Sequence, residues 1–155
     1  MIFRFLLVVC FVLIGTACSD GDLTPEEQIE KLITRIEEGV EARELGEIKE
    51  AVSDDYKDAR QQDKKALVNL ARFYFLRHQA IHLYTKIGSI DLIDEDNAKV
   101  VVYVGMAGSP VAEGESFAAL SADLHRFEAD LRLEDGDWRL MAAQWRRAKK
   151  SDFTD

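Results

Sequence analysis

Apolar and polar residues alternate strictly in the C-terminal part of the chain. Across residues 120–133 every second residue is apolar, with one slip of phase at residues 125–126. This alternation predicts a β-strand with one buried face, and the slip predicts a β-bulge. The turn sequence at 134–137 then leads into an apolar run at 138–147. Together the two runs, within the stretch 116–147, predict a long, bent antiparallel hairpin.

Three helices are predicted upstream of this hairpin, at residues 25–40, 45–52 and 64–78, because apolar residues recur there at helical spacing. Thr24 and Glu27 have the spacing of a capping box at the start of the first helix. The apolar side of the third helix is expected to contain Leu67, Leu70, Ala71, Tyr74 and Phe75.

The period of the pattern changes to two at Ile81, which predicts two further strands. They cover residues 81–92 and 98–106, with a polar turn at 94–97 and an interruption at Gly88. Three helices followed by a curved four-stranded antiparallel sheet make an α+β fold, with the helices packed on one face of the sheet.

The first residues have the pattern of a processing segment. Arg4 precedes an apolar run at 5–14, and small residues follow it. The run is too short to span a membrane, which takes about 20 residues. A secretory signal peptide or a short membrane anchor would both explain this pattern.

The residues Gly15-Thr16-Ala17-Cys18 resemble the lipobox of bacterial lipoproteins. This resemblance implies cleavage before Cys18 and lipid attachment to Cys18, which would anchor the domain to a membrane. Ser19 after the cysteine implies the outer membrane, with the domain facing the periplasm. The expected parts are a signal peptide (1–17), a lipidated tether (18–23), a folded domain (24–148) and a C-terminal tail (149–155).

Charge and cysteine content narrow the classes of function. The whole chain carries a net charge of −9. Cleavage before Cys18 removes one arginine, so 19 Lys and Arg then oppose 29 Asp and Glu, a net charge of −10. Such a chain repels nucleic acid, which we exclude as a partner. Cys10 would leave with the signal peptide and Cys18 would be acylated, so no internal disulfide is expected.

Two short motifs are similar to those of the NTF2-like (SnoaL-like) superfamily. They are residues 52–56, Val-Ser-Asp-Asp-Tyr, and residues 134–140, Glu-Asp-Gly-Asp-Trp-Arg-Leu. The order of predicted elements across residues 25–147 resembles that superfamily too. The resemblance implies a cone-shaped fold with a pocket between the helices and the concave sheet face, open to a small apolar ligand. The superfamily includes isomerases, dehydratases, hydrolases and members without catalysis.

The resemblance to isomerases implies a carboxylate base and a tyrosine donor in such a pocket. Asp55 with Tyr56 is one candidate pair, and Tyr84 or Tyr103 could supply the donor from the sheet. Residues 54–55 equally suit the end of a helix, and tyrosines are common in half-buried strands. The acids of the predicted hairpin strand lie opposite its apolar series. The pattern therefore favours a domain without catalysis.

The three histidines do not predict a metal site. His78 and His82 would share a helix face only if the third helix continued, and the change of period at Ile81 indicates that it ends. His82, His125 and Asp123 could form a site, but nothing in their spacing requires it. We expect surface histidines, no metal and no cofactor.

Two predicted strands are apolar on both sides, whereas the helices can cover only one face of the sheet. Val101, Tyr103, Met141 and Trp145 are the expected apolar residues of the other face. They predict a homodimer or a partner protein of the cell envelope. The function expected from the sequence is thus a lipid-anchored periplasmic lipoprotein with a binding or interaction domain. The alternative is an enzyme acting on a small apolar molecule.

Overall fold

A computed structural model describes residues 23–107, 123–149 and 152. Three helices precede four strands, which confirms the α+β fold class. The elements are α1 (Pro25–Glu41), α2 (Leu45–Ala51), α3 (Lys64–Arg77), β1 (His82–Leu92), β2 (Asn97–Ala107), β3 (Asp123–Glu134) and β4 (Asp137–Arg147). The expected signal peptide, Cys18 and the first residues of the expected hairpin lie outside the described residues.

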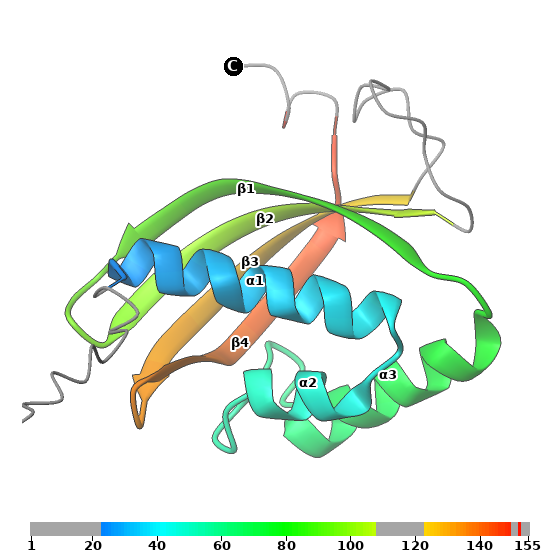
Figure 1. The fold of residues 1–155 in the computed structure, drawn as a ribbon, viewed down its shortest axis with the longest axis horizontal. Helices are drawn as coiled ribbons and strands as arrows, with labels where there is room; N and C mark the ends of the chain where they lie inside the picture. Colours follow the sequence, from blue (N-terminus) through cyan, green and yellow to red (C-terminus); the bar gives the residue numbers. More distant parts are fainter. Residues whose placement is uncertain (1–22, 108–122, 150–151, 153–155) are drawn as a thin grey trace, which may run out of the picture.

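The strands form one antiparallel sheet in the order β1-β2-β3-β4. The sheet is curved, α1 crosses its concave face, and α2 and α3 lie beyond the C-terminal half of α1 (Figure 1). The capping box predicted at the start of α1 is present: the Thr24 hydroxyl accepts from the Glu27 amide, and the Glu27 carboxylate accepts from the Thr24 amide. The turn between β3 and β4 has positive φ at Asp135 and Gly136, as a tight hairpin turn requires.

The predicted interruption at Gly88 is confirmed, whereas the predicted bulge is in the wrong place. Gly88 interrupts the pairing of β1 with β2, as expected. The β2–β3 pairing runs without a break through His125 and Arg126, so no bulge lies there. Asp130 pairs with Ala142 and Leu131 with Leu140, which leaves Met141 of β4 as the extra residue. The slip of phase in the sequence arises because polar His125 lies on the concave face.

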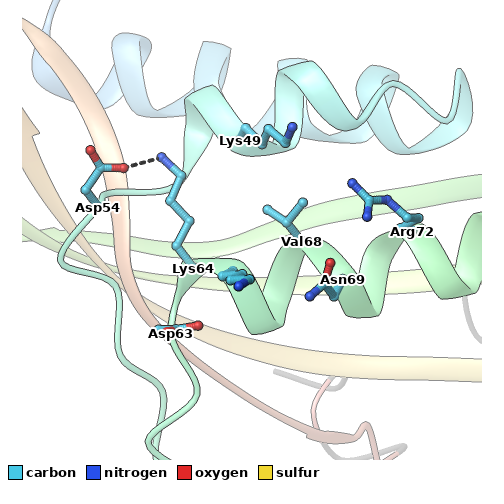
Figure 2. Close-up of a pocket in the computed structure, with 8 residues that line it drawn as sticks. Lys49, Asp54, Asp63, Lys64, Val68, Asn69 and Arg72 are labelled. Carbon is cyan, nitrogen blue, oxygen red and sulfur yellow. Dashed lines mark hydrogen bonds and ion pairs between the residues drawn. The ribbon is translucent and has the colours of Figure 1, made fainter.

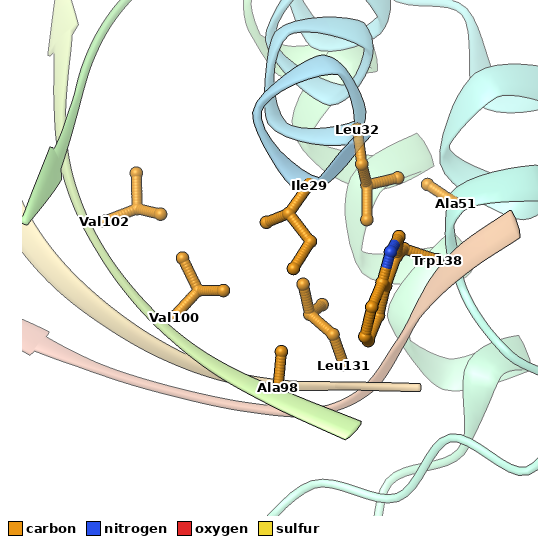
Figure 3. Packing of buried hydrophobic residues seen from close by; sticks show 8 residues of the cluster. All are labelled: Ile29, Leu32, Ala51, Ala98, Val100, Val102, Leu131 and Trp138. Carbon is orange, nitrogen blue, oxygen red and sulfur yellow. The ribbon is translucent and has the colours of Figure 1, made fainter. Parts of the chain in front are cut away.

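The main core lies between α1 and the concave face of the sheet. Side chains from β2, β3 and β4 meet Ile29 and Leu32 of α1, and Ile29 has no exposed surface (Figure 3). Trp138 lies between Leu32, Ala51 and Leu131, so it joins α1, α2 and the sheet. A second cluster fills the space under α2 and α3, and its buried residues are Ile48, Val52, Tyr56, Phe75 and Ile81.

The segment between α2 and α3 is bonded to the outer edge of β4. The Ser53 amide donates to the Leu140 carbonyl at 3.0 Å, and the Lys57 amide donates to the Met141 carbonyl at 2.9 Å. Val52 forms an isolated parallel bridge with Leu140. The bulge in β4 therefore coincides with the place where this segment extends the sheet.

Gly39 sets the close approach of α1 to α2. A methyl group at this position would lie 2.7 Å from Cβ of Glu47, well inside van der Waals contact. We expect Gly39→Ala to lower the free energy of unfolding by about 1–2 kcal/mol, because overpacking outweighs the gain in helix propensity. Urea titration followed by circular dichroism measures the change.

Gly46→Ala in α2 is the matched control for Gly39→Ala. A methyl group at Gly46 meets nothing within 4 Å. Its substitution should therefore raise the free energy of unfolding by about 0.5–1 kcal/mol through helix propensity alone. Equal effects of the two substitutions would contradict the close packing of α1 on α2.

Candidate functional site

The concave face carries a row of partly exposed aromatic side chains beyond the main core. Buried Val102 is paired with Phe127, and Phe127 with Trp145, so the three residues share this face. His125 lies on the same face, opposite Val104. Trp145 is 38% exposed, although the main core covers the same face one or two residue pairs away.

We call His125, Phe127 and Trp145 the aromatic patch. The rings of Phe127 and Trp145 are stacked, with centroids 5.9 Å apart and planes at 25°. The His125 ring is tilted by 53° against Phe127, with centroids 6.3 Å apart. Such a set of rings offers flat apolar area to a ligand at a low cost in side-chain entropy.

Carboxylates of α1 reach β1, which β2 separates from the strands of the aromatic patch. Glu37 Oε2 accepts a hydrogen bond of 2.6 Å from the hydroxyl of Thr85, which is paired with Val104 on the concave face. Glu41 Oε1 accepts from the Leu83 amide at 2.7 Å. These bonds fix α1 against β1 and hold a partly buried acid, Glu37, on the concave side of the sheet, where Val104 lies between Thr85 and His125.

Sequence reasoning missed both acids. Glu37 follows Ile36 directly and precedes Val40 by three residues, so it borders the apolar stripe of α1. This position beside the apolar stripe is the feature of the sequence that indicates a glutamate on the side of the helix near the sheet. The carboxylates expected from the sequence were Asp55 at a helix end and the acids of the hairpin strand, and Glu37 within the first helix was not among them.

Asp55 and Tyr56 do not face a common space. The Asp55 side chain is 74% exposed and accepts a 2.9 Å hydrogen bond from Arg132, on the outer sheet face. Tyr56 is buried in the second cluster, and its hydroxyl has no hydrogen-bond partner among the described residues. Burial, with the nearby charge of Asp58, raises the pKa of Tyr56 to about 12. The backbone of Ala143 acts in the opposite direction on this pKa and is the smallest of the three influences, and it does not meet the geometry of a hydrogen bond to the hydroxyl.

Tyr84 and Tyr103 lie on the outer face of the sheet, which corrects their expected place in a pocket. Tyr84 is paired with Gly105, and Tyr103 with Lys86 and Arg126. The physical reason is the alternation of β1, in which Thr85 faces α1 and its neighbour Tyr84 must face away.

The four expected interface residues do not form one patch. Val101 and Tyr103 lie on the outer face, whereas Trp145 lies on the concave face. The extra residue at Met141 changes the alternation of β4, so residues after it face opposite to the expectation. Dimerisation or partner binding through Val101 and Tyr103 stays a prediction, which sedimentation can test.

The outer face is also more polar than the sequence pattern suggested. Lys99 and Asp130 form an ion pair at 2.7 Å on neighbouring strands. Arg126 pairs with Glu128, which also accepts a 2.9 Å hydrogen bond from Gln144. Only β2 is apolar on both sides in this part of the sheet, and charged groups surround its outer residues.

A hollow of about 600 Å³ lies between α2 and α3 (Figure 2). Lys64 donates a 2.7 Å hydrogen bond to Asp54 at its rim, and this bond lowers the pKa of Asp54. The hollow is lined by Lys49, Asp54, Asp63, Lys64, Lys65, Val68, Asn69 and Arg72. Basic side chains outnumber acidic ones there.

The histidines are placed as the change of period predicts. His78 follows the last residue of α3, and His82 begins β1. Within 23–107 and 123–149, no group of three His, Cys, Asp or Glu side chains is arranged to hold a metal ion. No helix in the described part of the chain is long and apolar enough to cross a membrane.

Solved structures resemble this one at low sequence identity. A protein of unknown function with a cystatin-like fold from Nostoc punctiforme is 15% identical with a TM-score of 0.62, over 84% of this chain and 97% of that one. An NTF2-like protein of unknown function in nutrient uptake from Rhodospirillum rubrum is 21% identical with a TM-score of 0.58, over 78% and 98%. A hexachlorocyclohexane dehydrochlorinase from Novosphingobium barchaimii is 15% identical with a TM-score of 0.62, over 80% and 86%.

No protein-family profile and no curated protein sequence matches the chain. At such identities the structural likeness establishes the fold alone, because one fold supports many functions. The fold is the NTF2-like fold, as the resemblance of residues 52–56 and 134–140 implied.

Proposed function

We propose that this protein is a lipid-anchored binding module of the cell envelope. Cys18 carries the lipid, and the domain faces the periplasm from the outer membrane. The support for the anchor is the lipobox-like sequence ending at Cys18. The support for binding is the aromatic patch on the concave face.

The exposure of Trp145 on the concave face is the observation that carries this function. A tryptophan stacked on Phe127 and left 38% exposed presents a flat apolar surface. Concave apolar surfaces with a few polar groups are typical of small-molecule sites. The ligand is therefore a planar apolar molecule, which rests on the aromatic patch while Glu37 and Thr85 orient its polar group.

Catalysis on a small apolar molecule is the second candidate, and Glu37 favours it. The partly buried Glu37 carboxylate would be the base in place of Asp55, which points away. A dehydrochlorinase shares the fold, but the likeness supplies no residue role. Turnover that disappears in Glu37→Gln while binding persists would favour an enzyme over a binding module.

Binding is tested with N-phenyl-1-naphthylamine, a neutral planar probe whose fluorescence rises in apolar sites. A chain beginning at Ser19 keeps every described contact, because the described residues begin at Leu23. We expect saturable binding that weakens about tenfold in Trp145→Ala, because a stacking surface is lost. Ile93→Ala, at a residue 59% exposed beside the β1–β2 turn, is the matched control and should bind as the unaltered chain does. Absent binding, or equal binding by Trp145→Ala, would overturn the proposal.

The anchor is tested separately by the intact mass of the membrane-extracted protein. We expect a mass that fits cleavage before Cys18 plus acyl chains, and its loss in Cys18→Ala. An uncleaved or unlipidated mass would reject the anchor and leave the binding proposal intact.

A further inference from the structure

Helix α3 differs in charge from the rest of the chain. Its sequence, KKALVNLARFYFLR, contains four basic residues and no acidic residue. The whole chain carries −9, so the residues outside α3 carry −13. An anionic surface would therefore attract α3 and repel most of the remaining molecule.

The same helix carries three of the large apolar side chains that are exposed in the described part of the chain. Leu70 is 48%, Phe73 54% and Leu76 79% exposed. Successive members of this set are three positions apart, so they share one side of a helix with about 3.6 residues per turn. Val68 and Phe75, in contrast, are buried against the rest of the domain. The helix is thus apolar on its inner side and again on its solvent side.

Basic side chains flank this exposed apolar stripe, which we define as Leu70, Phe73 and Leu76. The Arg77 guanidinium lies 4.8 Å from the centre of the Phe73 ring. Arg72 and Lys65 line the hollow between α2 and α3, and Arg72 is labelled there in Figure 2. At about 3.6 residues per turn, both lie beside Leu76 at the other side of the stripe. α3 lies at the margin of the molecule (Figure 1).

We propose that α3 binds an anionic lipid surface, with the stripe inserted among the headgroups and the basic residues against the phosphates. An apolar stripe with basic flanks is the pattern of helices that lie in a membrane interface. A second copy of this chain fits less well, since α3 against α3 would place four basic residues opposite four. The hollow beside Lys65 and Arg72 has room for a lipid phosphate, and Lys49 and Lys64 bring its basic side chains to four against the two carboxylates of Asp54 and Asp63.

The inference concerns a surface separate from the aromatic patch, and it does not require the lipid on Cys18. If that lipid is present, the two contacts act together, because residues 19–24 can span about 20 Å when extended. With α3 on the membrane, the molecule would lie on its helical side.

Vesicle flotation with the chain from Ser19 tests the proposal without the anchor. We expect binding to vesicles of phosphatidylcholine with 30% phosphatidylglycerol, loss of that binding at 0.5 M salt, and little binding to pure phosphatidylcholine. Lys65→Glu with Arg72→Glu should weaken partitioning at least 25-fold, since each basic residue contributes about a factor of five. Phe73→Ser with Leu76→Ser should reduce it at unchanged charge.

Two control variants separate α3 from general surface effects. Lys31→Glu, at an exposed position of α1, matches each charge reversal, and Ile93→Ser matches the loss of an exposed apolar side chain. Both should leave flotation within about a factor of five of the unaltered chain. Absent flotation, equal flotation with neutral vesicles, or flotation unchanged in the α3 variants would overturn the proposal. A dimer that dissociates in Phe73→Ser with Leu76→Ser, without vesicle binding, would overturn it in favour of a second copy.

Discussion

Replacing Trp138 by alanine is expected to reduce the free energy of unfolding by about 3–5 kcal/mol. Trp138 is 3% exposed and packs among side chains of α1, α2 and β3 (Figure 3). Its removal leaves a cavity that these elements cannot close without moving apart. Because typical domains are stable by about 5–15 kcal/mol, the variant should unfold at much lower urea concentration. Circular dichroism at 222 nm measures the midpoint.

Two substitutions make this result interpretable. Trp145→Ala removes the same side chain from a partly exposed site and should cost about 1 kcal/mol or less. Trp138→Phe keeps an aromatic ring in the core and removes an indole N–H that has no hydrogen-bond partner within the described chain, so it should cost about 1–2 kcal/mol. A loss below 1 kcal/mol in Trp138→Ala would show that the cluster does not hold α1 and α2 on the sheet.

High pH should destabilise the protein through Tyr56 by about 3 kcal/mol. The pKa of Tyr56 is raised from 10.0 to about 12 in the fold, first by burial and then by the charge of Asp58. Below pH 10 the phenol is neutral in both states. Between pH 10 and 12 the unfolded chain ionises while the folded chain stays neutral, so unfolding releases a proton and stability falls as pH rises. A difference of two pKa units between the folded and the unfolded chain corresponds to this loss of about 3 kcal/mol.

Tyr56→Phe isolates this effect from other groups that titrate at high pH. As pH rises from 9.5 to 11.5, the unaltered chain should lose unfolding free energy relative to Tyr56→Phe. At pH 8 the variant should be as stable as the unaltered chain or about 1 kcal/mol more stable, because the buried hydroxyl is unpartnered among the described residues. A pH-independent difference would contradict the raised pKa, and a loss above 1 kcal/mol at pH 8 would indicate a hydrogen bond to the hydroxyl.

The helices could be predicted closely because their limits are set by neighbouring residues. The Thr24–Glu27 capping box begins α1, and Asp63 caps α3 by accepting from the Ala66 amide at 2.9 Å. The solvent side of α3 could not be predicted in the same way. Leu70 was expected on the inner apolar side but is 48% exposed, since α3 is apolar on more than one side and tertiary packing selects among them.

The outer-face position of Val101 in β2 was predicted from the sequence, whereas the face of Trp145 at the end of β4 was not. The extra residue at Met141 coincides with hydrogen bonds from Ser53 and Lys57, more than 80 residues earlier in the chain. A contact between such distant segments leaves no mark on the local alternation. The alternation therefore placed Trp145 on the outer face, and the aromatic patch could not be predicted from the sequence.

The bonds between residues 53–57 and β4 also bear on how this protein could assemble. The backbone groups of an edge strand are a template on which another chain can pair. Here the middle of the β4 edge is already bonded within the molecule, whereas β1 is the other end of the sheet. Strand addition at the middle of β4 would therefore have to displace bonds that the molecule already makes. In β1 the Leu83 amide likewise donates to the Glu41 carboxylate. Both outer strands thus carry backbone groups that are already bonded within the molecule, which makes these parts of the sheet poorer templates for another chain.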